Sequence, residues 1–386
     1  MRGSKREKRP GVWELRVTVG RDPMTGKLRQ VSRSFHGGVR DAEDALRKLV
    51  GEVDAHGSAG GSRTLGDALH AWLDHRTALG RSPTTLANYA TKVRSVDATP
   101  LAAVRLSKLR AEHLNSFYRD RLARGDSAQT VCHFHRIIGG ALRFAVRQGW
   151  VPRNEADRAE PPSVVRKEGF APTNEQMLAL IDLAQRSRQP EMATVFVLAA
   201  LTGMRRGEIC GLRWSDIDTE RGVIKVTRSI YQVTGEVGVK SRKNSRALVI
   251  RLDQAGMDII ESRRARAVAE AGEAGVTLAA DAYFFSDDPA GLVPWTPNRI
   301  TQFVTRLRGK LGIPEFHFHA IRRWAGTEMS AGGIDVRDAA GRLGHADGGV
   351  VLLRHYAQAR TERDLAAATV LSRALGFGSG EDTSTT

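Results

Sequence analysis

The sequence predicts a multidomain α+β protein with three parts: a small β-sheet with one helix, an all-α domain, and a mainly α domain with a small β-sheet. Three observations support this prediction. The chain has 386 residues, and about 150 residues per domain corresponds to two or three domains. A hydrophobic fraction of 41% is sufficient for packed cores, which excludes wholesale disorder. A Gly/Ser-rich stretch at 56–62 and a Pro-containing stretch at 160–163 mark two joints.

The first part begins with a predicted strand over 12–19, where apolar and polar residues alternate as in a strand with one buried face. A turn at 22–26 and a second strand over 28–35 follow. Helical spacing of apolar residues then predicts a helix over 40–54. The strands carry three candidate DNA-binding residues: Arg16, Arg29 and Arg33. A basic sheet of this kind can place a β-ribbon in a DNA groove, although a small module for protein contacts is the alternative.

The second part reads as helical from 64 to 150. Apolar residues at helical spacing predict four helices: one marked by 65–73, one from 82 through 93, and two over 106–122 and 128–146. The polar faces carry many cations, including Lys92, Arg94 and Arg143. Such helices can clamp a DNA duplex through its phosphates. A charged helix face taken alone is more often simply solvated.

The charge distribution supports a nucleic-acid partner. The formal net charge is +16, and a basic excess of this size favours nucleic acid over an anionic membrane surface. Thirteen of these net charges lie in 1–166. No apolar run approaches the ~20 residues that a membrane span needs. The two cysteines, Cys132 and Cys210, exclude a disulfide scaffold and a cysteine zinc site, and they fit a reducing cytoplasm.

The third part contains a short motif suited to phosphate binding. An apolar helix over 195–201 ends in the run Thr202-Gly-Met-Arg-Arg-Gly-Glu208. Arg205 and Glu208 lie three residues apart at the start of the next helical turn. An arginine oriented by a glutamate suits bidentate binding of a phosphate, and a surface salt bridge is the alternative.

A β-rich stretch follows, with predicted strands over 222–227, 237–240 and 246–250. The last two strands are predicted to form a cationic hairpin over 240–246. A lysine on such a hairpin can donate a proton to a leaving oxygen. Lys240 is the first candidate and Lys243 the second. The four cations of the hairpin are equally suited to phosphate binding alone.

The segment 317–356 is the richest in reactive side chains. It contains His319-Ala-Ile-Arg322-Arg323, then Leu343-Gly-His345, then Arg354-His-Tyr356. His319 and Arg322 share one face of a predicted helix. A histidine cluster suggests metal binding, but no Asp or Glu stands at the spacing of a His-Glu-x-x-His helix. Guanidinium groups can neutralise a phosphate without a metal, so we expect neither a metal ion nor a cofactor.

Five motifs, in this order, resemble the tyrosine recombinase (phage integrase) family: Thr202-Gly-Met-Arg-Arg-Gly-Glu, a lysine on a β-hairpin, His319-x-x-Arg322, Leu-Gly-His345 and Tyr356. The resemblance implies the tyrosine recombinase fold with three domains. These are an arm-site DNA-binding domain of three strands and a helix at 1–57, a helical core-binding (SAM-like) domain at 64–160, and a catalytic domain at 168–375. The tail over 376–386, rich in Gly, Ser and Thr, is expected to be disordered.

The resemblance also implies the roles of single residues. The implied catalytic residues are Arg205, Lys240, His319, Arg322, His345 and Tyr356, with Glu208 in support. The two arginines clamp the phosphate, the tyrosine is the nucleophile, the lysine is the general acid, and the two histidines assist proton transfer and phosphate binding. The family commonly has a histidine directly after the second arginine, where this chain has Arg323. One accessory contact is therefore open.

The predicted function is site-specific recombination that integrates or excises a mobile element such as a prophage, in the cytoplasm of a bacterial host. The expected partners are double-stranded DNA at core and arm attachment sites, three further copies of the chain in a tetramer on DNA, a directionality factor and a host DNA-bending protein, with no membrane. A type IB topoisomerase uses a similar residue set but needs no arm-binding module. A DNA-binding protein without activity is a further alternative, against which the intact Arg205, His319, Arg322 and Tyr356 argue.

Overall fold

The computed structural model describes residues 3–21, 28–56, 62–165, 169–241 and 247–344. Contacts along the chain divide it into two compact units, Met1–Arg166 and Lys167–Thr386. The first unit contains two separate hydrophobic cores, and the second unit contains the largest core. None of the helices in the described ranges is long and apolar enough to cross a lipid bilayer.

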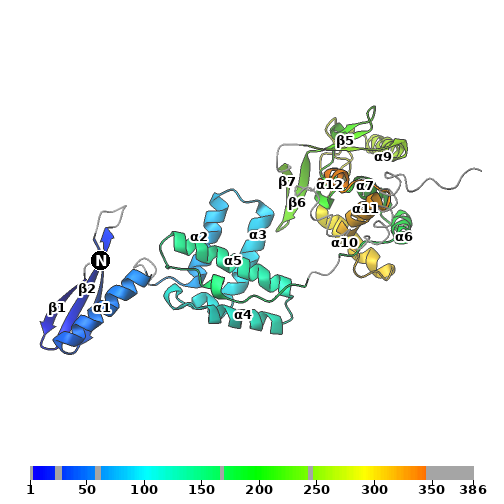
Figure 1. Ribbon diagram of the computed structural model, residues 1–386. Helices are drawn as coiled ribbons and strands as arrows, with labels where there is room; N and C mark the ends of the chain where they lie inside the picture. The colour runs from blue at the N-terminus through cyan, green and yellow to red at the C-terminus, as the bar shows by residue number, and fades with distance from the viewer. Residues whose placement is uncertain (1–2, 22–27, 57–61, 166–168, 242–246, 345–386) are drawn as a thin grey trace, which may run out of the picture. The chain divides into compact units, whose positions relative to one another are not determined.

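The N-terminal part is an antiparallel sheet with a helix on one face (Figure 1). Its elements are β1 (Gly3–Arg9), β2 (Val12–Arg21), β3 (Leu28–His36) and α1 (Val39–His56), with the strands in sequence order. Trp13, Leu15 and Val17 alternate along β2 and form a core with Leu49 and Val53 of α1. Strand β1 has no predicted counterpart in the residue pattern, because five of its seven residues are charged and give no apolar alternation.

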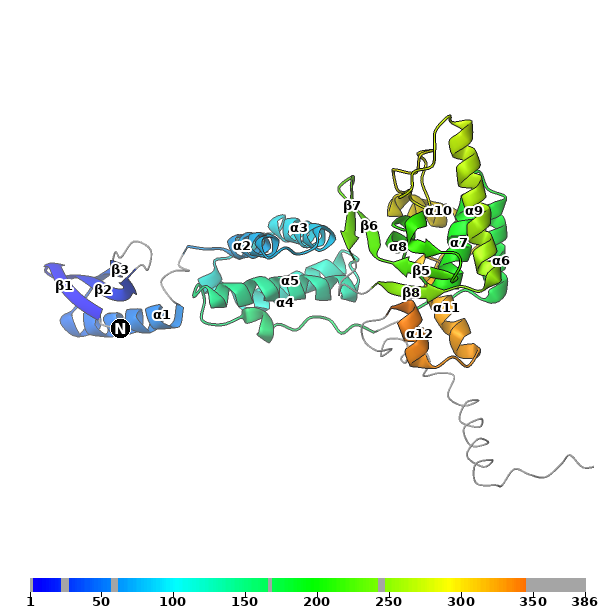
Figure 2. The same cartoon turned by 90° about the horizontal axis from the view of Figure 1, so that it is seen from above.

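The helical part, 62–165, surrounds the second core (Figure 2). Its helices are α2 (Leu65–Ala78), α3 (Pro83–Asp97), α4 (Ala111–Ala123) and α5 (Ala128–Arg147). The prediction of one helix over 106–122 is wrong in its first turn: a short 3-10 turn at Leu106–Lys108 precedes α4. The cause is Leu109, whose backbone is extended and whose side chain is buried in the core.

The C-terminal unit consists of helices around a core, with two small sheets (Figure 2). Its helices are α6 (Asn174–Gln185), α7 (Glu191–Thr202), α8 (Arg206–Cys210), α9 (Gln254–Glu273), α10 (Pro297–Lys310), α11 (His319–Ala331) and α12 (Val336–Leu343). Helix α7 is apolar along nearly its whole length and lies buried against α6 and α11. Helix α12 contacts both α11 and a strand of the sheet, so it closes one side of the unit.

The strands of this unit pair differently from the prediction. They are β4 (Ile217–Asp218), β5 (Val223–Val226), β6 (Arg228–Val233), β7 (Glu236–Ser241) and β8 (Leu248–Arg251). A tight turn at Thr234 and Gly235, both with positive φ, closes an antiparallel hairpin of β6 and β7. Strand β8 instead joins β4 and β5 in the second sheet. The predicted hairpin between 237–240 and 246–250 is therefore wrong, and 242–246 lies outside the described residues.

Candidate active site

The turn after α7 sets the position of Arg205. Gly203 ends the helix with φ 64°, a left-handed conformation that favours glycine, and a side chain there would collide with Leu343. Arg205 then caps α8. Its backbone N–H donates to Glu208 Oε2 at 2.8 Å and its Nη1 donates to Glu208 Oε1 at 3.0 Å. Glu208, 5% exposed, thus orients both the backbone and the guanidinium of Arg205.

Arg322, on the first turn of α11, points into the protein and is 4% exposed. Its Nη1 donates to the carbonyl oxygen of Gly203 at 2.7 Å, and its Nη2 donates to the carbonyl oxygen of Leu343. Two carbonyl acceptors fix the plane of a guanidinium. Because Gly203 is two residues from Arg205, the first bond places Arg322 beside the segment that carries the other predicted phosphate-binding arginine.

His319 begins α11, one turn before Arg322. Its pKa is lowered to about 4, chiefly because the surrounding protein partly desolvates its ring, although the residue is exposed. The positive charges of Arg322, Arg323, His317 and Arg205 lower the pKa of His319 further. Arg205 and Arg322 therefore lie close enough to His319 to act on its charge, and the imidazole is neutral at neutral pH.

Replacing His319 should change how stability depends on pH. Its pKa is about 4 in the folded protein against a reference value of 6.5, so the unfolded chain binds more protons between these values. The contribution of His319 to the free energy of unfolding therefore rises with pH across that window. We expect the free energy of unfolding of wild type, relative to that of His319→Gln, to decrease as pH falls from 6.5 to about 4.

Urea unfolding at a series of pH values measures this difference. His317→Gln is the matched control for loss of a nearby imidazole, since His317 is exposed and lies two residues away. If the difference in free energy of unfolding between wild type and His319→Gln stays constant across this pH window, His319 has its ordinary pKa in the folded protein and the prediction is wrong.

Lys240 lies on β7, opposite Ser229 of β6 in the sheet register. Strand β6 packs against α8 so closely that a side chain at Gly207 would collide with the carbonyl oxygen of Ile230. Lys240 is thus one strand away from the helix that Arg205 caps. Lys243, the alternative general acid, lies outside the described residues.

Sequence reasoning missed residues that hold this hairpin in place. Arg228 Nη1 donates to Asp216 Oδ2 at 2.6 Å, and Asp216 is 7% exposed. Arg228 lies opposite Ser241 in the sheet, next to Lys240. In the sequence this aspartate and this arginine are twelve residues apart and resemble ordinary surface charges. Only the β6–β7 pairing identifies their ion pair as the base of the hairpin.

His345 and Tyr356 lie outside the described residues. The described chain ends at Gly344, which follows α12 in a left-handed conformation with φ 63°. The preceding carbonyl, that of Leu343, accepts a hydrogen bond from Arg322. The described chain therefore ends beside Arg322, and the position of His345 stays a prediction.

The arginines predicted to bind DNA in the N-terminal sheet do not share one face. Arg16 lies on the face opposite α1 and its Nη2 donates to Glu14 at 2.9 Å. Arg33 lies on the side of α1, where it pairs with Glu52 at 3.0 Å. Arg29 is part of β3, and its side chain is outside the description. Arg16 is therefore better placed than Arg33 to contact a ligand on the open face.

The predicted DNA-binding cations of the helical part also differ in their surroundings. The Nζ atom of Lys92 lies 4.5 Å from the centre of the Phe134 ring, in a cation–π contact. Arg94 and Arg143 are both exposed, and Arg143 pairs with Asp157 at 3.6 Å. The latter two present their charge at the surface, whereas Lys92 is partly engaged by the core.

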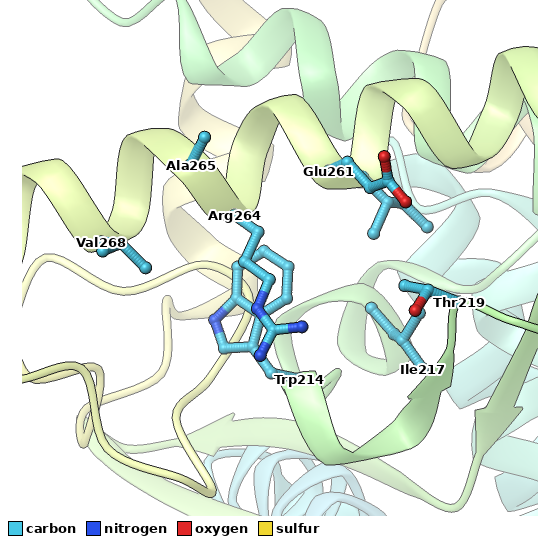
Figure 3. Close-up of a pocket in the computed structure, with 8 residues that line it drawn as sticks. Trp214, Ile217, Thr219, Glu261, Arg264, Ala265 and Val268 are labelled. Atoms are coloured by element: carbon cyan, nitrogen blue, oxygen red, sulfur yellow. The ribbon is translucent and has the colours of Figure 1, made fainter.

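One pocket of the second unit is distinct from the candidate site. It has a volume of about 570 Å³ and lies between α9 and the segment of β4, with Trp214, Ile217 and Arg264 among its lining residues (Figure 3). None of the predicted catalytic residues that the structure describes lines it. In the described ranges, no group of three His, Cys, Asp or Glu residues is arranged to hold a metal ion.

The candidate active site consists instead of side chains that donate hydrogen bonds. Arg205 and Arg322 each carry a planar guanidinium, a group whose N–H donors match the non-bridging oxygens of a phosphate diester. The carboxylate of Glu208 is bonded to Arg205, so it orients this guanidinium rather than standing apart from it. The arrangement suits binding of one phosphate group.

Comparison with known proteins identifies the family. Residues 172–363 match the model of the Phage integrase family. The chain is 23% identical over 357 residues to a protein named "Tyrosine recombinase XerC-like" from Caldanaerobacter subterraneus subsp. tengcongensis, covering 87% of this chain and 89% of the relative. It is 25% identical over 237 residues to an integrase from Saccharopolyspora erythraea, covering 59% of this chain and 52% of the relative.

Solved structures share the fold. The integrase of the Tn1549 transposon, in complex with transposon right end DNA, aligns with a TM-score of 0.67 and 18% identity over 79% of this chain and 99% of its own. A lambda integrase tetramer bound to a Holliday junction aligns with a TM-score of 0.56 and 19% identity, over 88% and 95% of the two chains. The predicted fold class, multidomain α+β of the tyrosine recombinase type, is confirmed. The chain belongs to the tyrosine recombinase (phage integrase) family of site-specific DNA recombinases.

Proposed function

We propose that this protein is an integrase that cuts and rejoins DNA strands through a covalent 3′-phosphotyrosine intermediate, and so integrates or excises a mobile element such as a prophage. The observation that carries this proposal is the grouping of Arg205, His319 and Arg322, which come from two separate segments and act on one another electrostatically. The match of 172–363 to the integrase family supports it, because this range includes Tyr356.

The proposed chemistry starts with neutralisation of the phosphate. A phosphodiester resists nucleophilic attack because its oxygens are anionic, and negative charge builds up further as the pentacoordinate state forms. Arg205 and Arg322 donate to the non-bridging oxygens, and the neutral His319 adds a donor. Preorganised donors of this kind stabilise the transition state because they need no reorganisation during the reaction. No ATP and no metal ion enters this scheme.

Attack and proton transfer complete the step. The hydroxyl of Tyr356, with an unperturbed pKa near ~10, loses its proton to solvent, and the cations of the site favour the resulting phenolate. A bond forms from its oxygen to phosphorus as the bond from phosphorus to the 5′-oxygen breaks. Lys240, or Lys243 in its place, protonates the leaving oxygen, and His345 assists. The phosphotyrosine link retains the bond energy, so a 5′-hydroxyl of the partner strand reverses the step.

The proposed partners are core and arm attachment sites on double-stranded DNA, in the cytoplasm of a bacterial host. Four copies act on two duplexes, in keeping with the tetramer on a Holliday junction in the lambda integrase structure. A directionality factor and a host DNA-bending protein complete the proposed assembly. In this proposal, the domain at 1–57 binds the arm sites and the domain at 64–160 binds the core sites. The domain at 168–375 carries out catalysis, and 376–386 is the tail.

A nicked core-site duplex tests the reaction. Cleavage next to the nick releases a short oligonucleotide, so the covalent adduct accumulates, and peptide mapping identifies the linked residue. We expect a single adduct at Tyr356. Absence of an adduct, or linkage at another residue, would contradict the proposal. Relaxation of supercoiled plasmid without strand exchange between two sites would favour a type IB topoisomerase instead.

Removal of 1–57 should weaken recombination between sites that carry arm sequences much more than cleavage of the nicked core site, because only the former uses the N-terminal sheet. Arg16→Gln in the full chain should act in the same direction. Arg33→Gln is the matched control, since Arg33 lies on the side of α1. Gel-based recombination and cleavage assays measure both activities. Equal loss of the two activities on truncation would argue against a separate arm-binding role.

A further inference from the structure

Helix α12 is tied to its neighbours by Arg342, which lies in its last turn. Arg342 Nη2 donates to the carbonyl oxygen of Leu201 at 2.8 Å, and its Nη1 donates to that of Arg251 at 3.1 Å. Leu201 belongs to the last turn of α7, and Arg251 ends β8. Burial lowers the pKa of the Arg342 guanidinium, and the side chain links three elements at once.

Two of these elements, α7 and α12, lead to predicted phosphate-binding residues. The end of α7 leads through Gly203 to Arg205, and the end of α12 leads through Leu343 to His345. Arg322 bonds the carbonyls of Gly203 and Leu343, and the side chain of Leu343 packs where a side chain at Gly203 would stand. The last carbonyls of a helix lack partners within it and carry partial negative charge, so a cation at this place is stabilising.

Two guanidiniums therefore join the ends of α7 and α12, and they differ in what they do there. Arg322 contacts the last residue of each segment and belongs to the predicted phosphate site. Arg342 instead contacts Leu201, two residues before Gly203 on α7, and Arg251 at the end of β8. Helix α12 is eight residues long and also packs against α11 through the buried residues Ala339, Ala340 and Leu343.

We propose that Arg342 is a positioning residue for strand cleavage. It holds the ends of α7 and α12 at one spacing, so that Arg205 and Arg322 meet a single phosphate. This role rests on the recombinase function proposed for the site. It concerns the geometry of cleavage rather than the affinity for DNA, because Arg342 acts through backbone carbonyls.

Three full-length variants test the role. Arg342→Met removes both hydrogen bonds and keeps most of the side-chain length, and Arg342→Lys keeps the charge with a single donor group. Arg337→Met is the matched control, since Arg337 is an exposed arginine on the same helix. Single-turnover cleavage of the nicked core site is measured at saturating protein, and DNA affinity is measured separately. A misplaced catalytic group can cost on the order of 10²-fold in rate.

We expect Arg342→Met to lose on the order of 10²-fold in cleavage rate with nearly unchanged DNA affinity. Arg342→Lys should recover part of this loss, and Arg337→Met should cleave as wild type does. If Arg342→Met does not fold, the cleavage rate and DNA affinity of Arg342→Lys are compared with those of wild type instead. Unchanged cleavage in both Arg342 variants would overturn the proposal. Failure of the wild-type protein to form any adduct would instead overturn the recombinase function on which it rests.

A second substrate separates positioning from a general loss of structure. A methylphosphonate at the scissile position lacks one anionic oxygen and therefore depends less on the guanidiniums. If Arg342 acts by placing Arg205 and Arg322, the rate loss of Arg342→Met shrinks on this substrate. An equal loss on both substrates would show that Arg342 has only a structural role.

Discussion

Replacing Tyr356 with phenylalanine is expected to abolish the covalent protein–DNA adduct while DNA binding stays near that of wild type. Phenylalanine has the same ring but no oxygen, so no phosphotyrosine can form. The cations that bind phosphate, Arg205 and Arg322, are unchanged by the substitution. Denaturing gels of the nicked core-site reaction measure the adduct, and fluorescence anisotropy measures binding.

The control for this experiment is Tyr283→Phe. The hydroxyl of Tyr283 accepts a hydrogen bond from Arg213 at 2.9 Å, and the residue is 6% exposed. Its loss removes a tyrosine oxygen from the same unit without touching the predicted site, so the adduct should persist. An adduct in the Tyr356→Phe protein would mean that another residue is the nucleophile.

The second large effect is expected at the two arginines. Arg205→Lys and Arg322→Lys each keep a positive charge but lose the planar fork that matches two phosphate oxygens. We expect each to lower the single-turnover cleavage rate on the order of 10²–10³-fold, the range for removal of one preorganised donor. The nicked core site gives this rate directly.

The same two variants should differ in stability. The side chain of Arg205 is 44% exposed, so Arg205→Lys should leave the free energy of unfolding almost unchanged. Arg322 is buried and bonds the carbonyls of Gly203 and Leu343. A lysine cannot reach both, and a buried acceptor without a partner costs about 1–3 kcal/mol. Urea unfolding measures the difference. Equal destabilisation by the two substitutions would contradict this account of Arg322.

The family of this protein was easier to predict from the sequence than the pairing of its strands. Arg205 and Glu208 are three residues apart, and the structure bonds them to each other at the start of α8, as that local spacing suggested. The glycine at 203 likewise marks the end of α7 because few other residues adopt its backbone conformation.

Strand pairing depends on contacts between distant segments, which leave weak local signals. Strand β1 is highly charged because it lies at the edge of its sheet, and Lys5 on its α1 side pairs with Glu43 rather than entering the core. In the second unit, the Thr234-Gly235 turn was the available signal for the hairpin of β6 and β7. The prediction placed the hairpin at the next connection instead, because the stretch at 240–246 is rich in cations.

No local sequence pattern marks a residue such as Arg342, which anchors its helix to distant backbone carbonyls. Arg342 is bonded to carbonyl oxygens 91 and 141 positions earlier in the chain, and backbone carbonyls are the same at every residue. The sequence shows only an arginine on a polar helix. Its two long-range hydrogen bonds become visible when α7, β8 and α12 have been assembled.

The hydrogen bonds of Arg322 have an evolutionary consequence. Since they hold Gly203 and Leu343 together, Arg322 is constrained by folding as well as by the reaction that we propose, whereas Tyr356 is constrained by the reaction alone. A relative that keeps this arginine but has lost the tyrosine should therefore fold without cleaving DNA. A relative that has lost the arginine should be impaired in both folding and cleavage.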